Sequence, residues 1–284
     1  TSVYFIPFDG PTYIAGDDTG VGYGTDIILD ASTSNAKPDV IVESTSPFDI
    51  HVAWEDQDSG DKDIKIRTSS DSGVSFGSEI DISGTNSVES TNVKLAESGG
   101  TIDASWLEGT GATIDQVFVA SSANTYATPV AVSTNTGQSN GQQIIADGAN
   151  VFAVWQDNID SGASNEILFS SSTNSGSTFG TSINLSESSG DSVSPKISGN
   201  STHVNVVWRD NSFALDAANN IDGQVWLKSS SDSGASFGGL QVISESTTDG
   251  TNTYSNVSPF SPTGGITPIS IPNISSSEDV VVSL

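Results

Sequence analysis

Four tryptophans recur at nearly constant spacing along this chain. Trp54, Trp106, Trp155 and Trp208 follow one another at intervals of 52, 49 and 53 residues. A period of about 50 residues is typical of architectures that stack one supersecondary unit, such as propeller blades. We therefore expect a repeated structural unit in place of a single irregular core.

Each tryptophan ends an apolar run of period two. The runs are Ile50/Val52/Trp54, Ile102/Ala104/Trp106, Val151/Ala153/Trp155 and Val204/Val206/Trp208. Alternate residues of a strand share one face, so each run predicts a strand with one buried side. Two more short apolar segments follow each tryptophan, and another precedes it, most clearly at 195–198. Four strands in each unit indicate propeller blades.

The two ends of the chain carry pieces of the same unit. Residues 26–30 resemble its closing strand, whereas residues 272–275 match the first-strand pattern of 195–198. The terminal strands expected from these patterns contain Val3 and Phe5 at one end and Val280, Val282 and Leu284 at the other. A fifth blade shared by both ends would satisfy the backbone groups of both. It closes either within one chain or between neighbouring molecules, which would give a filament.

The fold predicted is all-β: a β-propeller of five four-stranded antiparallel blades within a single domain, residues 1–284. Its parts are a half-blade at 1–29, complete blades at 30–83, 84–133, 134–186 and 187–244, and an insertion plus half-blade at 245–284. The insertion could instead form strands of its own, pairing 257–259 with 266–271.

Three units carry the same turn, Ser-x-Asp/Asn-x-Gly-x-x-Phe, between the same two predicted strands. Asp or Asn accepts hydrogen bonds from nearby backbone amides, Gly permits a positive φ, and Phe anchors the loop. The residues concerned are Asp71, Gly73, Phe76, Asn174, Gly176, Phe179, Asp232, Gly234 and Phe237. The second unit departs from the pattern, because residues 121–126 lack the glycine.

These turns resemble the Asp box, or BNR repeat, of sialidase-like β-propellers, and the resemblance covers residues 30–244. It implies a structural role for the turns, away from any active site. The family binds a substrate carboxylate with three arginines, one of them from a Phe-Arg-Ile-Pro motif. This chain has two arginines, Arg67 and Arg209, and its nearest match, residues 5–7, lacks the arginine. We therefore expect a non-catalytic member of the family, with no catalytic residues.

The strongly acidic charge balance excludes some classes of binding partner. Eight Lys and Arg against 35 Asp and Glu give a net charge of -27, which opposes binding to nucleic acid or anionic lipid. No apolar run approaches the roughly 20 residues of a membrane span. Neither Cys nor Met occurs in the chain, and an exported, extracellular or cell-surface protein is expected.

An acidic loop follows the first tryptophan strand. Oxygen ligands at alternate positions suit Ca²⁺, and the candidate ligands are Asp56, Asp58, Asp61 and Asp63. A solvated turn without metal is the alternative. The histidines His51 and His203 begin tryptophan strands and are interpreted as solvated strand ends.

The function hypothesis from these observations is an extracellular structural protein, a self-assembling protomer of a surface layer, matrix or filament. The first alternative is a propeller that binds carbohydrate or protein through loop tyrosines, namely Tyr13, Tyr23, Tyr126 and Tyr254. The third hypothesis is a degenerate sialidase-like glycoside hydrolase.

Overall fold

The computed structural model describes residues 3–5, 27–31, 36–57, 60–84, 88–109, 115–159, 164–211 and 224–244. These residues form four four-stranded sheets and one two-stranded sheet, all antiparallel. The helical structure in this part of the chain is one 3-10 turn, Ser122–Asn124, so it contains no helix able to cross a membrane. The prediction of an all-β chain built from four-stranded antiparallel units is confirmed.

Each large sheet keeps its strands in chain order. The first sheet holds β3 (Ala36–Val42), β4 (Ile50–Asp56), β5 (Asp63–Ser69) and β6 (Ile80–Asp81). The second holds β7 (Ser90–Ser98), β8 (Thr101–Gly109), β9 (Asp115–Ser121) and β10 (Val130–Ala131). The third holds β11 (Ser139–Asp147), β12 (Asn150–Asp157), β13 (Glu166–Ser172) and β14 (Ile183–Asn184). The fourth holds β15 (Ser192–Gly199), β16 (Val204–Asp210), β17 (Gln224–Ser230) and β18 (Gln241–Ser244).

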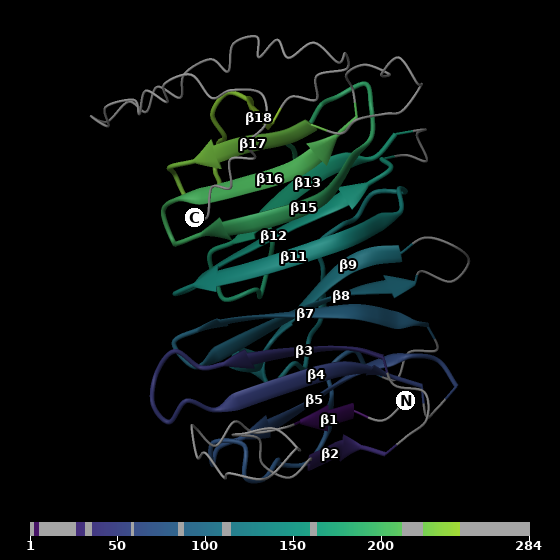
Figure 1. Ribbon diagram of the computed structural model, residues 1–284, viewed down its shortest axis with the longest axis vertical. Helices are drawn as coiled ribbons and strands as arrows, with labels where there is room; N and C mark the ends of the chain where they lie inside the picture. The colour runs from purple at the N-terminus through teal and green to yellow at the C-terminus, as the bar shows by residue number, and fades with distance from the viewer. Residues whose placement is uncertain are drawn as a thin grey trace, which may run out of the picture.

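The first strands of the four sheets lie next to one another. β3 contacts β7, β7 contacts β11, and β11 contacts β15, and Figure 1 shows these strands in succession along the molecule. We call the surface that they share the inner-strand face. The tryptophans lie on the second strands and are at most 2% exposed. Apolar clusters between successive sheets hold them. The prediction of a single buried side is wrong, because these strands are buried on both faces: Val151, Ala153 and Trp155 of β12 pack in one cluster, and its Phe152 and Val154 pack in the next.

Every first strand contains a bulge at the same level. The register with the second strand shifts there, and one residue takes a positive φ: Lys37, Asn92, Gly141 or Ser194. Bulges twist a strand and redirect its side chains. The register resumes at Asp39, Lys94, Gln143 and Lys196, which therefore occupy one level of the inner-strand face.

The three repeated turns share one hydrogen-bond pattern. In the first, the Ser69 hydroxyl donates to Asp71 Oδ1 at 2.8 Å, and the amides of Gly73 and Ser75 donate to Ser69 Oγ and Asp71 Oδ1. Hydrogen bonds from the Ser75 side chain and backbone lower the pKa of Asp71 to about 2. The carboxylate therefore organises the loop.

Two of these turns also rest on the preceding sheet. A Cβ built on Gly176 would lie 3.3 Å from Oδ1 of Asp103, and one on Gly234 would lie 2.5 Å from Cζ of Phe169. In the second sheet the 3-10 turn replaces the repeated turn, and Tyr126, 9% exposed, enters the core shared with the first sheet. The turns thus join neighbouring sheets as well as closing hairpins.

The two-stranded sheet covers one side of the first sheet. It consists of β1 (Val3–Phe5) and β2 (Ile27–Asp30), and Val3 and Leu29 pack with Val52 and Trp54. Of the predicted terminal strands, β1 is therefore in place. Val280, Val282 and Leu284 lie outside the described residues, as does the segment 245–271. The fifth blade stays a prediction.

Candidate functional site

Side chains that recur at the same position in every sheet belong to the scaffold, and a functional site is expected where the side chains differ from sheet to sheet. The second residue after each tryptophan is such a recurring side chain. It is acidic in all four sheets: Asp56, Glu108, Asp157 and Asp210. Two of these acids accept hydrogen bonds from serines of their own first strands, Ser139 to Asp157 at 2.8 Å and Ser192 to Asp210 at 2.6 Å. The Trp-x-Asp/Glu pattern was visible in the sequence and was missed.

Glu55 is the opposite case, because the other sheets have Leu107, Gln156 and Arg209 at its position. Its side chain is 1% exposed, yet three groups reach it. The Asn92 amide donates to Oε1 at 2.6 Å, Lys37 Nζ lies 3.1 Å from Oε1, and Lys62 Nζ lies 3.9 Å from Oε2. This carboxylate joins the first sheet to the bulge of the second.

Amide side chains extend the same contact toward the third sheet. Asn92 Nδ2 donates to Gln142 Oε1 at 3.1 Å, and Gln142 Nε2 donates back to the Asn92 carbonyl. Gln142 is fully buried. Because buried amides are costly without partners, this pair fixes the spacing of the two bulges.

The fourth sheet joins through its own bulge. The Ser194 amide donates to Gln156 Oε1 at 2.9 Å, and Lys196 Nζ donates to Gln143 Oε1 at 3.3 Å. At the other end of the level, Asp39 Oδ2 accepts from the Leu95 amide at 2.8 Å. One polar level therefore links all four sheets across the inner-strand face.

We call the side chains of this level the polar cluster. Its members are Lys37, Asp39, Glu55, Lys94, Gln143 and Lys196. Three of the chain's eight Lys and Arg residues are among them. With three lysines and two carboxylates the polar cluster has a net charge of +1, in a chain of net charge -27.

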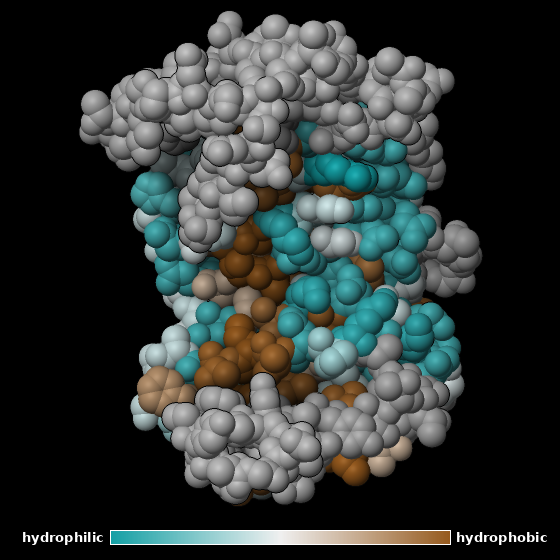
Figure 2. All heavy atoms as spheres, viewed as in Figure 1, coloured by the Kyte–Doolittle hydropathy of each residue, from teal (hydrophilic) through white to brown (hydrophobic). Residues whose placement is uncertain are grey.

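An apolar band accompanies the polar cluster. Figure 2 shows hydrophobic side chains gathered in a band over β3, β7 and β11, with hydrophilic side chains beside it. Val40 and Val42 of β3 are 56% and 51% exposed. A surface with hydrogen-bonding groups next to exposed apolar groups is chemically suited to sugars, which present hydroxyls and C–H faces together.

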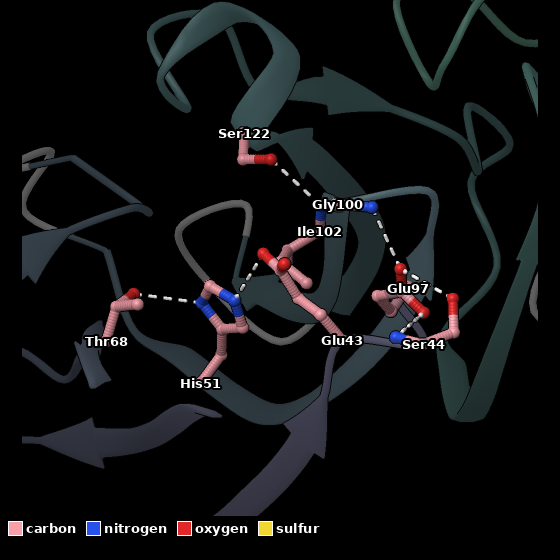
Figure 3. Close-up of polar contacts among 8 residues, drawn as sticks. All are labelled: Glu43, Ser44, His51, Thr68, Glu97, Gly100, Ile102 and Ser122. Atoms are coloured by element: carbon pink, nitrogen blue, oxygen red, sulfur yellow. Dashed lines mark hydrogen bonds and ion pairs between the residues drawn. The ribbon is translucent and has the colours of Figure 1, made fainter. Parts of the chain in front are cut away.

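His51 lies at the other end of the strands. Its Nδ1 is 2.9 Å from Thr68 Oγ1 and its Nε2 is 3.2 Å from Glu43 Oε1, as Figure 3 shows. The interpretation as a solvated strand end is wrong for His51, which is 7% exposed because the second sheet covers it. An arrangement of hydroxyl, imidazole and carboxylate can support nucleophilic catalysis.

The surroundings of His51 favour a structural role instead. Beside it, the Ser44 amide and hydroxyl donate to Glu97 of the next sheet, at 3.1 and 3.2 Å. Equivalent contacts join the later sheets at this end, Gly148 to Ser98 and Ser201 to Asp147. Because contacts of this kind recur, we assign this end to the scaffold.

The predicted calcium ligands are only partly brought together. Asp56 and Asp63 are buried partners across β4 and β5, Asp61 is exposed, and Asp58 lies outside the described residues. Lys65 Nζ lies 3.7 Å from Asp63 Oδ2. Within the part of the chain that is described, no three His, Cys, Asp or Glu side chains gather to hold a metal. Calcium binding stays a prediction.

Solved structures of similar fold include three kinds of enzyme. An α-L-arabinofuranosidase of Fusarium graminearum with arabinobiose is 12% identical, with a TM-score of 0.51 over 81% of this chain and 68% of that one. An ulvan lyase bound to -[GlcA(1-4)Rha3S]- is 12% identical, with a TM-score of 0.53 over 77% of this chain and 58% of that one. NanB sialidase of Streptococcus pneumoniae is 9% identical, with a TM-score of 0.49 over 74% and 52%. No protein-family model and no curated protein matches the sequence.

These likenesses support the β-propeller fold and correct two predictions. The structural, self-assembling protomer and the non-catalytic member are contradicted, because the similar structures are carbohydrate-active enzymes. The missing arginine cluster argued only against sialidase chemistry. Solved structures of similar fold include an arabinofuranosidase and a lyase, and the absence of a sialidase arginine cluster does not exclude such chemistry.

Proposed function

We propose that this chain is a carbohydrate-active enzyme that binds a glycan along the inner-strand face, with the polar cluster at its centre. The observation that carries the proposal is that the side chains of the polar cluster differ from sheet to sheet, whereas the scaffold that holds them repeats. A polar level spanning four sheets beside an apolar band offers a sugar chain both kinds of contact. The enzymatic fold of the similar structures supports the same conclusion.

The cluster contains two carboxylates. Glycoside hydrolysis commonly uses two carboxylates about 5 to 10 Å apart, and Asp39 and Glu55 lie on neighbouring strands. Lys94 and Lys196 would attract anionic sugar units, because ammonium groups pair with carboxylate and sulfate. An acidic glycan is therefore the substrate class that we propose, and a polysaccharide places the protein outside the cell.

We also propose that the repeated turns are Asp boxes. Their Ser, Asp or Asn, and Gly residues make the same contacts in three sheets, with Asn174 replacing aspartate in the third. They lie at the end of the strands away from the polar cluster. Their proposed role is to hold the sheets, not to bind substrate.

Turnover of a glycan panel tests the proposal. The panel contains neutral arabinan, a sulfated uronate polysaccharide and a sialoside, with reducing-sugar release and formation of unsaturated uronate as readouts. Glu55→Gln and Asp39→Asn should each lower turnover by about 100-fold or more. Lys94→Gln and Lys196→Gln should mainly raise KM for the acidic polysaccharide.

Asp81→Asn is the matched control, because Asp81 lies on the outer strand β6 and pairs with Lys65 at 3.1 Å. Its turnover should equal that of the unchanged protein. Absence of turnover on every glycan, or equal losses in Asp81→Asn and Glu55→Gln, would refute the assignment.

A further inference from the structure

The chain carries four copies of Asn-x-Ser/Thr, the acceptor sequence for N-linked glycans, at Asn184, Asn200, Asn256 and Asn273. The last two copies lie outside the described residues. A copy can be modified in the folded protein only where a transferase reaches both the asparagine and the hydroxyl group two residues later. The structure separates the two described copies on this point.

Asn200 begins the exposed turn between β15 and β16. Its Oδ1 accepts three hydrogen bonds, from the amide and the hydroxyl of Thr202, both at 3.0 Å, and from the His203 amide at 2.9 Å. Asn200, Thr202 and His203 are all exposed. Within the described part of the chain, no hydrogen bond engages Nδ2 of Asn200. The turn therefore fixes the oxygen of this side-chain amide and leaves its nitrogen free.

Polar contacts hold this turn against its neighbours. The Ser201 amide donates to Asp147 Oδ2 of the third sheet at 2.6 Å, and the Ser233 hydroxyl donates to the Ser201 carbonyl at 2.6 Å. The Ser233 amide also donates to the Thr202 carbonyl at 3.0 Å. None of the residues 200–203 is buried. Opening of the turn therefore exposes no core side chain, which places it among the segments that open at a low cost in free energy.

The copy at Asn184 lies in a different environment, on the outer strand β14. Leu185, its middle residue, is 0% exposed and packs in the core between the third and fourth sheets. The Ser186 hydroxyl, in a residue that is 6% exposed, donates to Glu166 and accepts from the Ile167 amide at 2.8 Å. A transferase could reach this copy only after the strand had left the sheet.

We propose that Asn200 is an acceptor for an N-linked glycan and that Asn184 is not. The proposal rests on the extracellular location proposed above, because this acceptor sequence is used in exported chains. In the reaction, Nδ2 of Asn200 forms a bond to C1 of a lipid-linked oligosaccharide, the bond from C1 to the lipid phosphate oxygen breaks, and a base of the transferase takes the amide proton. Oδ1 gains negative charge as that proton leaves, and the donors of Thr202 and His203 stabilise this charge.

The glycosylated turn keeps its shape. A glycosylated amide retains its oxygen, so the three hydrogen bonds to Oδ1 persist. Asn200 follows Lys196 by four residues, which is about 13 Å of strand at about 3.3 Å per residue. The glycan therefore starts beyond the level of the polar cluster and leaves the cluster open.

Secretion of the full chain from a eukaryotic host that glycosylates its exports tests the proposal. Trypsin releases residues 197–209, which contain Asn200, and glutamyl endopeptidase releases residues 167–187, which contain Asn184. Peptide N-glycosidase in heavy-oxygen water then marks each occupied asparagine as a labelled aspartate. Mass spectrometry should find an occupancy at Asn200 on the order of tenfold or more above that at Asn184.

Two substitutions of Thr202 form the matched pair. Valine keeps the shape of threonine without its hydroxyl, so Thr202→Val should abolish occupancy at Asn200, whereas Thr202→Ser should retain it. Thr202 is exposed, so both variants should fold, and equal urea midpoints would verify this. An unmodified Asn200 in the secreted protein, equal occupancy at Asn184, or a glycan that persists in Thr202→Val would overturn the proposal.

The readout is the mass of a peptide and not turnover. A chain that cleaves no glycan can still carry one at Asn200, and an active chain can lack it. The failure of this proposal and the failure of the proposed activity are therefore told apart.

Discussion

Asp103 is a buried carboxyl group at a position that each sheet fills differently. The third residue before tryptophan is His51, Asp103, Phe152 and Asn205 in the four sheets. Asp103 is 2% exposed beneath the turn glycine Gly176, and its Oδ1 has no hydrogen-bond partner among the described residues. Burial raises the pKa of this group to about 6, against the lowering effect of a hydrogen bond with Ser121. The residue therefore weakens the fold when it ionises.

The stability of the protein should consequently fall as the pH rises from about 4 to about 6. A raised folded pKa means that the native state holds the proton more tightly than the unfolded chain, so the loss appears above the unfolded value. Two pH units correspond to about 3 kcal/mol. Asp103→Asn should remove this loss, raising the free energy of unfolding at pH 7 and flattening its pH profile, measured by urea denaturation. Asn205→Asp, at the exposed equivalent position, should change little; lower stability of Asp103→Asn at pH 7 would contradict the argument.

Local residue patterns revealed the scaffold better than the site. The period-two runs and the Ser-x-Asp-x-Gly turns are short-range signals, and both appear where the sequence placed them. The polar cluster gave no such signal, because the positive-φ residue of the bulge is Lys37, Asn92, Gly141 or Ser194 in turn, and no single residue type marks it. His51 could not be judged either, since its cover comes from another sheet.

At the scale of elements, the repeated turns of the third and fourth sheets are both hairpin connections and contacts with the preceding sheet. These two copies differ in what lies beneath the turn glycine, which is a carboxylate at Gly176 and a phenyl ring at Gly234. Phe169 also meets Phe237 of the next turn edge to face, with ring centroids 4.9 Å apart. Packing across sheets therefore concentrates at these loops.

Gly234→Ala should destabilise the protein by about 1–3 kcal/mol more than Gly84→Ala. Both glycines have a similar positive φ, 77° and 81°, so backbone strain is matched between the two variants. A methyl group at Gly234 would meet Phe169 at 2.5 Å, whereas Gly84 has nothing within 4 Å. Thermal unfolding of the two variants measures the difference. Equal losses would show that the turn does not bear on the third sheet.

At the scale of the whole molecule, the dominant property is charge. The net charge is -27, so the carboxylates of the surface repel one another. Four of the eight basic residues lie in or beside strands of the first sheet: Lys37, Lys62, Lys65 and Arg67. Residues 36–84 also hold eleven Asp and Glu, so the first sheet keeps a net charge of -7 (4 − 11) despite these four cations. Self-repulsion of this kind lowers the stability of a compact state.

Added salt should therefore raise the melting temperature. Between ionic strengths of about 10 mM and about 150 mM the Debye length falls from about 30 Å to about 8 Å, which screens distant carboxylates from one another. We expect a rise on the order of a few degrees at pH 7, followed by calorimetry in sodium chloride. The rise should shrink near pH 4.1, the isoelectric point of the sequence. A melting temperature that falls with salt at pH 7 would show that attractive pairs outweigh the repulsion.

The turn that rests on the preceding sheet has a consequence for how such a chain can evolve. A unit copied by gene duplication brings its own turn, and that turn needs only the face of the unit before it. New units can therefore be inserted between existing ones without redesigning distant parts of the protein. Divergence would then be tolerated beneath each turn independently, which is where Asp103 and Phe152 already differ.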